Sequence, residues 1–141
     1  MKPVRQRYVL PLYSLGTNSI ALGATASGST AYAIAIGSGP SGAGGAKATG
    51  GGSIAIGGGA GTVPTGTAAS ASGQRAIAIG QNTVAAFANS VALGYRSTVG
   101  SASSVALGDL ATTGATGVNV AIGNLSTANA STAGGGAVAI G

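Results

Sequence analysis

A short pattern of alternating apolar residues returns eight times along the chain. Each copy reads branched apolar, Ala, branched apolar, Gly, and the copies end at the glycines Gly23, Gly37, Gly57, Gly80, Gly94, Gly108, Gly123 and Gly141. Apolar residues two positions apart lie on one face of a strand, and the glycine that follows can adopt the positive φ of a tight turn. Each copy therefore predicts a short strand that ends at its glycine.

A second, weaker pattern of small or β-branched residues lies between the copies. It is seen at residues 25–28, 83–86, 97–100 and 111–114, and the closing glycines are most often 14 residues apart. A unit of this length has room for two short strands and two turns, which is one coil of a β-solenoid in which each strand pairs with its counterpart one coil on. We therefore expect an all-β fold, a β-solenoid of about eight 14-residue coils.

The branched residues of the repeat are expected to form the core inside each coil, with Ala on the other face. This predicted repeat core consists of Ile20, Leu22, Ile34, Ile36, Ile54, Ile56, Ile77, Ile79, Val91, Leu93, Val105, Leu107, Val120, Ile122, Val138 and Ile140. Such a core is thin, and most of the apolar content is Ala, so burial between chains has to add to the stability. The flat Ala face would allow close approach between subunits, although the sequence leaves open which faces meet.

The pattern divides the chain into an N-terminal arm, residues 1–15, and a head, residues 16–141. Two long steps between closing glycines predict inserted loops at residues 38–51 and 58–74. Insertions in solenoids often bind ligands, but neither of these carries an aromatic platform or a charge cluster. We therefore favour plain surface insertions over binding loops.

Composition excludes most kinds of active site. The 141 residues contain no His, no Cys and a single acidic residue, Asp109, and the charged fraction is 5%. Without imidazole, thiolate or a pair of carboxylates, general acid/base chemistry, thiol nucleophiles and the usual metal ligands are missing. We expect no enzyme, no cofactor and no metal site.

The arm differs from the repeats because it combines positive charge with larger apolar residues. The residues expected to carry its role are Lys2, Arg5, Arg7, Tyr8, Leu10, Leu12 and Tyr13. Two interpretations stay open: the arm caps the open end of the solenoid, or it attaches the protein to a capsid, portal-region or tail protein.

Nucleic-acid binding is disfavoured because no aromatic strip accompanies the charges, and no segment has the length of a membrane span.

The copies at residues 89–94 and 103–108, Asn-Ser-Val-Ala-Leu-Gly and Ser-Ser-Val-Ala-Leu-Gly, resemble the YadA-like head repeats of trimeric autotransporter adhesins. The resemblance extends from about Gly16 to Gly141. It implies a left-handed parallel β-roll in which three identical chains lie side by side, displayed at a surface as an adhesive or spacer head. The same repeat also occurs in fibre and spike proteins of tailed bacteriophages.

A bacterial autotransporter is expected to carry a signal peptide, a coiled-coil stalk and a membrane anchor. We find none of these segments in the sequence. The preferred prediction is therefore a non-enzymatic homotrimeric fibre, spike or decoration protein on the surface of a phage virion, docked through its arm and contributing to adhesion to a host surface molecule. The alternative is the head fragment of a bacterial trimeric autotransporter adhesin, located at the bacterial cell surface, that binds host matrix or a receptor.

Overall fold

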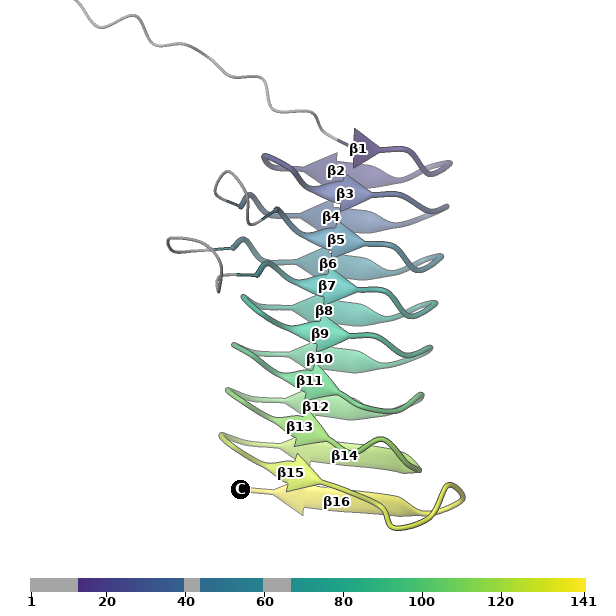
Figure 1. Cartoon of the computed structure of the whole chain (residues 1–141), viewed down its shortest axis with the longest axis vertical. Helices are drawn as coiled ribbons and strands as arrows, with labels where there is room; N and C mark the ends of the chain where they lie inside the picture. Colours follow the sequence, from purple (N-terminus) through teal and green to yellow (C-terminus); the bar gives the residue numbers. More distant parts are fainter. Residues whose placement is uncertain (1–12, 40–43, 60–66) are drawn as a thin grey trace, which may run out of the picture.

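The computed structural model describes residues 13–39, 44–59 and 67–141. Regular structure in these ranges is entirely β, arranged in two parallel sheets of eight strands each (Figure 1). One sheet contains the odd-numbered strands and the other contains the even-numbered strands, and we call them the odd-strand sheet and the even-strand sheet.

The strands of the odd-strand sheet are two residues long, and those of the even-strand sheet have three or five residues. The odd strands are β1 Tyr13–Ser14, β3 Ser27–Gly28, β5 Lys47–Ala48, β7 Ser70–Ala71, β9 Val84–Ala85, β11 Thr98–Val99, β13 Thr112–Thr113 and β15 Thr127–Ala128. The even strands are β2 Ile20–Leu22, β4 Ile34–Ile36, β6 Ile54–Ile56, β8 Ile77–Ile79, β10 Val91–Leu93, β12 Val105–Leu107, β14 Val118–Ile122 and β16 Gly136–Ile140.

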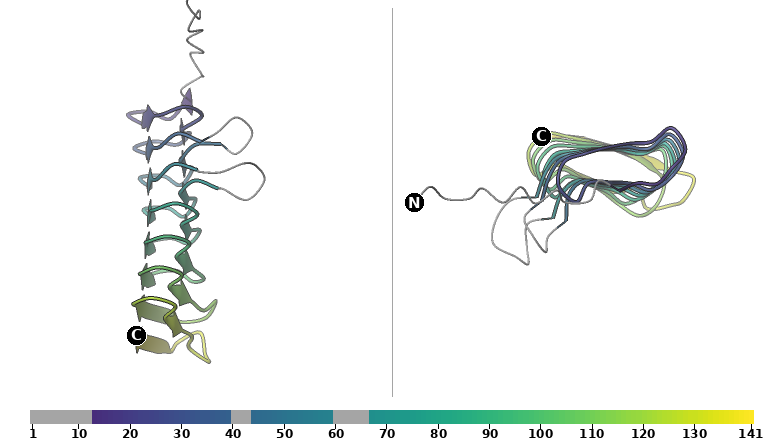
Figure 2. Two further views of the ribbon diagram at one scale, coloured as in Figure 1. Left: turned by 90° about the vertical axis from the view of Figure 1, so that its left-hand side faces the viewer. Right: turned by 90° about the horizontal axis from the view of Figure 1, so that it is seen from above.

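Each coil contributes one strand to each sheet and pairs with the next coil in register. In the even-strand sheet, for example, Val91 pairs with Val105 and Leu93 with Leu107, while Thr98 pairs with Thr112 in the odd-strand sheet. Seen along the axis, the coils superpose as a flattened ring (Figure 2). The expected parallel β-solenoid with two short strands per repeat is thus confirmed, and seven coil-to-coil steps separate the eight described strands of each sheet.

The interior of the coil is built from alanine. The central Ala of the strands β4 to β14 is fully buried, and it packs against small inward residues of the odd-strand sheet. Apart from Val99, every buried hydrophobic residue among those described is Ala. The apolar contact between the two sheets is therefore made mainly by the methyl groups of Ala, with Val99 as the largest buried apolar side chain.

The predicted placement of the branched residues inside the coil is consequently wrong. They lie on the outer face of the even-strand sheet, partly or largely exposed, because they alternate with the inward alanines. The residues concerned are Ile20, Leu22, Ile34, Ile36, Ile54, Ile56, Ile77, Ile79, Val91, Leu93, Val105, Leu107, Val120, Ile122, Val138 and Ile140. The Ala face, expected to lie between subunits, is instead the inside of each subunit.

The closing glycine of the repeat is required by the turn that follows each even strand. At Gly94 φ is +127°, and a Cβ built there would lie 2.3 Å from the backbone oxygen of Gly108. Neither the conformation nor the space accepts a side chain. The described closing glycines from Gly23 to Gly123 share positive φ, which confirms that the strands end where the repeat predicts, whereas Gly141 is not among the positive-φ residues.

The two ranges predicted to be inserted loops contain strands as well as loop residues. Strand β5 falls inside the range 38–51 and β7 inside the range 58–74, so these ranges are not insertions throughout. The additional residues lie between β4 and β5 and between β6 and β7. Residues 40–43 and 60–66 within them lie outside the described residues.

Hydroxyl groups complete the turns that lead into the even strands. Ser90 Oγ donates to the carbonyl oxygen of Phe87 at 2.6 Å, and Ser19 Oγ donates to that of Gly16 at 2.7 Å. In the equivalent position, Ser53 is fully buried and its Oγ has no hydrogen-bond partner. The serine of the repeat therefore usually satisfies a turn carbonyl rather than facing a ligand.

Candidate oligomer interface

The outward branched residues form two straight columns along the even-strand sheet. Because neighbouring even strands pair in register, each column places equivalent side chains directly above one another. The first column is Ile20, Ile34, Ile54, Ile77, Val91, Val105, Val120 and Val138, and the second is Leu22, Ile36, Ile56, Ile79, Leu93, Leu107, Ile122 and Ile140. We call the pair of columns the apolar ladder. At about 4.8 Å per step, seven steps extend over roughly 34 Å.

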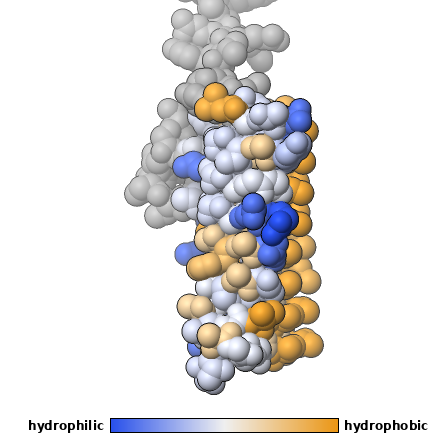
Figure 3. All heavy atoms as spheres, turned by 90° about the vertical axis from the view of Figure 1, so that its right-hand side faces the viewer, coloured by the Kyte–Doolittle hydropathy of each residue, from blue (hydrophilic) through white to orange (hydrophobic). Residues whose placement is uncertain are grey.

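Much of the ladder is open to solvent in the single chain. Leu93 and Leu107 are each 37% exposed, and Ile20 and Leu22 near one end are 51% and 59% exposed. The space-filling view shows the ladder as a continuous hydrophobic stripe along one side of the molecule (Figure 3). Soluble monomers rarely present so continuous an apolar surface, and such surfaces mark sites of contact with another protein.

None of the charged side chains in the described residues belongs to the ladder. The charged side chains in the described part of the chain are Lys47, Arg75, Arg96 and Asp109, and all four are exposed. Lys47 belongs to the odd-strand sheet, and the other three lie in the turns at the edges of the coil. The ladder can therefore be covered without burying an ionised group, which is the main cost that a contact between subunits must avoid.

Burial of the ladder would contribute a large part of the stability. A fully buried Val, Leu or Ile side chain contributes about 1.5–3 kcal/mol relative to full exposure. Since the ladder side chains are already partly covered by their neighbours, about 1 kcal/mol remains for each, which amounts to the order of 10 kcal/mol per chain. This is comparable to the whole free energy of unfolding of an ordinary domain, about 5–15 kcal/mol.

The other predicted site residues are either structural or outside the described part. Six of the arm residues, Lys2, Arg5, Arg7, Tyr8, Leu10 and Leu12, lie outside the described residues, and Tyr13 begins β1. The described ranges hold no cluster of three or more His, Cys, Asp or Glu side chains that could bind a metal. They also hold no helix long and apolar enough to cross a membrane.

One buried polar residue was missed by the sequence patterns. Asn119 is fully buried in β14, where its Nδ2 donates to the Thr116 carbonyl at 2.8 Å. Its Oδ1 accepts hydrogen bonds from the backbone N–H groups of Ala130 and Ala137, at 3.1 and 3.2 Å. The sequence does distinguish this position, because the other copies of the repeat have Ser or Ala where this copy has Asn. Asn119 therefore ties the last described coil to the one before it.

A comparison with models of protein families finds a match. The family model described as the YadA head domain repeat matches residues 14–39, 44–60, 71–97 and 88–111, which together cover more than half of the chain. These segments include ladder strands from β2 to β12. Among curated proteins, none matches the chain.

Proposed function

The chain belongs to the family of YadA head domain repeats, and from this premise we propose that it forms a homotrimeric, non-enzymatic head that is displayed at a surface and serves in adhesion. The observation that carries the proposal is the apolar ladder, a solvent-exposed strip that a single chain cannot bury. The family supports the threefold stoichiometry, and the ladder supplies a surface on which three chains can meet.

In the proposed trimer the three ladders face a common axis that runs parallel to the solenoids. Three identical chains arranged in this way close a ring, so no ladder is left over to recruit a further chain. A straight ladder suits such an axis because every coil presents two branched apolar side chains at equivalent, paired positions. The left-handed winding implied by the resemblance stays part of this proposal.

This arrangement leaves the odd-strand sheet and both turn edges facing outward. These surfaces carry the exposed lysine, arginines and aspartate as well as the hydroxyl side chains of the odd strands. Adhesive contacts would therefore be made by the odd-strand sheet and by the edges. The ladder, by contrast, would serve assembly alone.

Two settings satisfy the proposal. On a bacterial surface the head would belong to an adhesin that binds host matrix or a receptor, and on a virion it would be a fibre or decoration docked through residues 1–15. The genes that flank the coding sequence separate the two. Structural virion genes would support the second setting, and a stalk with a membrane anchor encoded in the same reading frame would support the first.

The trimer is tested by the mass of the purified chain in native solution, measured by light scattering with and without residues 1–15. We expect three chains in both cases. The variant Leu93→Asp places a carboxylate from each chain at the axis and should abolish the trimer, because burial of an unpaired charge costs several kcal/mol. Thr98→Asp is the matched control, since it adds the same charge to the outer face of the odd-strand sheet. A monomeric wild type, or a Leu93→Asp variant that stays trimeric, would contradict the proposal.

A further inference from the structure

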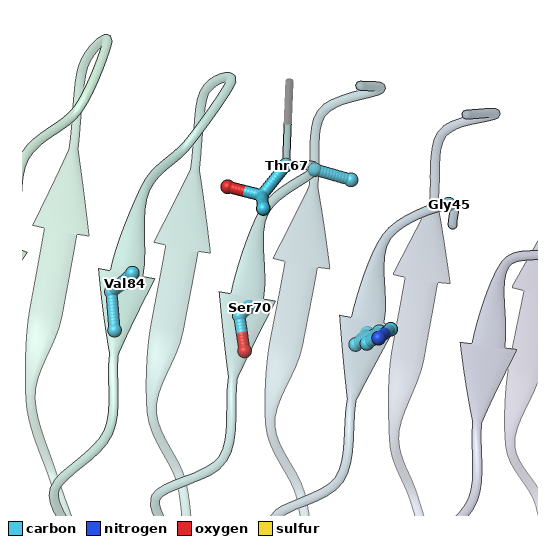
Figure 4. Close-up of a pocket in the computed structure, with 6 residues that line it drawn as sticks. Gly45, Thr67, Ser70 and Val84 are labelled. Atoms are coloured by element: carbon cyan, nitrogen blue, oxygen red, sulfur yellow. The ribbon is translucent and has the colours of Figure 1, made fainter. Parts of the chain in front are cut away.

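A depression on the odd-strand sheet has the features of a small binding site. It is lined by Gly45, Lys47, Thr67, Ala68, Ser70 and Val84 and has a volume of about 220 Å³. Ser70 and Val84 lie on the neighbouring strands β7 and β9, and Gly45 and Thr67 lie in the segments that lead into β5 and β7 (Figure 4). The depression thus spans three successive coils of the surface that the proposed trimer leaves exposed.

The hollow arises from the sizes of the residues that lie in register. Lys47 pairs with Ser70, and Ser70 pairs with Val84, so a small side chain stands between two larger ones. On one side the wall is glycine backbone: a Cβ built on Gly45 would lie 2.6 Å from the carbonyl oxygen of Ala24. The shape is therefore built by strand pairing and close backbone packing rather than by long flexible side chains.

Lys47 gives the depression its charge. It is the one charged residue in the odd strands, and its side chain lies close to Gly44, next to Gly45 in the chain, where a Cβ built on Gly44 would lie 3.8 Å from Nζ. The single acidic side chain of the protein, Asp109, follows β12, several coils away from β5. No carboxylate of this chain therefore neutralises Lys47, and an external anion would be the first to do so.

The remaining groups suit a hydroxylated ligand. Thr67 Oγ1 donates to Asn82 Oδ1 at 2.6 Å, and the Thr67 carbonyl accepts the Asn82 backbone N–H at 2.9 Å, so the hydroxyl is held in place with its lone pairs available. Ser70 adds a second hydroxyl, while Ala68 and Val84 supply apolar surface. Hydroxyl partners beside a small apolar patch match the two faces of a sugar ring.

We infer that this depression, defined by Lys47, Thr67, Ser70 and Val84, binds an anionic monosaccharide unit of a glycan, with Lys47 at its carboxylate or sulfate. The volume lies below the roughly 300–1,000 Å³ of sites for drug-sized ligands, so one sugar unit is the expected occupant and the affinity per site is weak. Three sites in one trimer would raise the avidity for a glycan-coated surface. The inference rests on the proposed function in one respect, since the odd-strand sheet must stay exposed in the trimer.

The test measures binding of three sugars that differ in one substituent, namely glucose, glucuronic acid and glucose sulfate, to the full chain by saturation-transfer NMR. We expect saturable binding of one or both acidic sugars, and of glucose only at much higher concentration. Preference between the two acidic probes identifies the source of the charge. Lys47→Gln should weaken binding about tenfold or more, because a hydrogen bond to a charged group is lost. Ser70→Val, which fills the hollow, should weaken it to a similar extent.

Arg96→Gln is the matched control, because it removes the same charge from a turn outside the depression. Binding of this variant should equal that of the wild type. The inference is overturned if neither acidic sugar binds saturably, if glucose binds equally well, or if Arg96→Gln weakens binding as much as Lys47→Gln. Light scattering on the same samples keeps the two proposals apart, because a trimer that binds none of the probes would overturn this inference and leave the proposed trimeric head standing.

Discussion

Two adjacent residues of β10 test which face of the repeat belongs to the coil and which to the assembly. Ala92 is fully buried inside the coil, whereas Leu93 points outward and is 37% exposed. We consider the variants Ala92→Val and Leu93→Ala. If the described orientation is correct, the first variant damages the fold of each chain and the second damages mainly the contact between chains.

The expected cost of Ala92→Val follows from the packing around Ala92. Its in-register neighbours are Ala78 and Ala106, and the facing odd strands contribute Ala85 and Val99 to the same core. Added methyl groups in a filled core cost about 1–3 kcal/mol. Because every neighbour sits on a paired strand that cannot move alone, we expect the upper part of this range, about 2–3 kcal/mol per chain.

Leu93→Ala is expected to cost less free energy per chain than Ala92→Val, but the loss occurs in all three chains of the trimer. About a third of the leucine surface remains open in the single chain, so its burial at the interface contributes about 1 kcal/mol. Three chains lose about 3 kcal/mol together, which raises the dissociation constant of the trimer about a hundredfold.

The assay combines urea unfolding, followed by circular dichroism, with light scattering over a dilution series. Ala92→Val should lower the unfolding midpoint while the folded fraction still elutes as a trimer. Leu93→Ala should dissociate at higher protein concentration than the wild type. The reasoning is refuted if Ala92→Val unfolds like the wild type and the dissociation of Leu93→Ala is unchanged.

Five further changes have defined outcomes. Leu110 has a φ of 57°, so Leu110→Asn should raise the melting temperature, since Asn tolerates this conformation better; a lower value would contradict the assignment. Ser90→Ala should lower the unfolding free energy by about 1 kcal/mol, whereas Ser53→Ala, which removes an unsatisfied hydroxyl, should leave it equal or higher; both follow from urea titration. Asn119→Ala leaves one buried and one part-buried N–H group without an acceptor and should cost about 2–4 kcal/mol by the same titration. Deletion of residues 1–7 should leave a soluble trimer by light scattering, and aggregation would show that the arm is a cap.

The strand positions and their pairing could be predicted from the sequence because the repeat is strict. Two branched residues around one Ala define an even strand, and equivalent positions in successive copies then set the register, as in the pairing of Val91 with Val105. The odd strands were harder to locate. Lys47–Ala48 and Ser70–Ala71 carry no apolar pair, so the sequence patterns placed both strands inside loops.

The sequence could not show which face of each even strand lies inside the coil, and the reason is physical. Alternation shows which residues share a face but not which face is inside, and the transfer free energy of Ile and Leu favours the inside. The odd strands contain a charged residue, Lys47, which has to face solvent and therefore fixes Ala48 as an inward residue. The even strands contain no charged residue, so nothing in a single copy distinguishes the two faces.

The outward orientation of the branched residues changes how the small core of each coil is interpreted. A coil closed by alanine on both sheets buries few carbons per residue, so by itself it offsets little of the chain entropy. The residues with the largest transfer free energy lie on the outside, in columns that the described residues of the chain leave partly exposed. In the proposed trimer, folding and assembly are then parts of one equilibrium, in which the small core fixes the register and the ladder supplies most of the remaining stability. It follows that the trimer should unfold at a midpoint that rises with protein concentration, whereas a coil stabilised from within would show one midpoint at all concentrations.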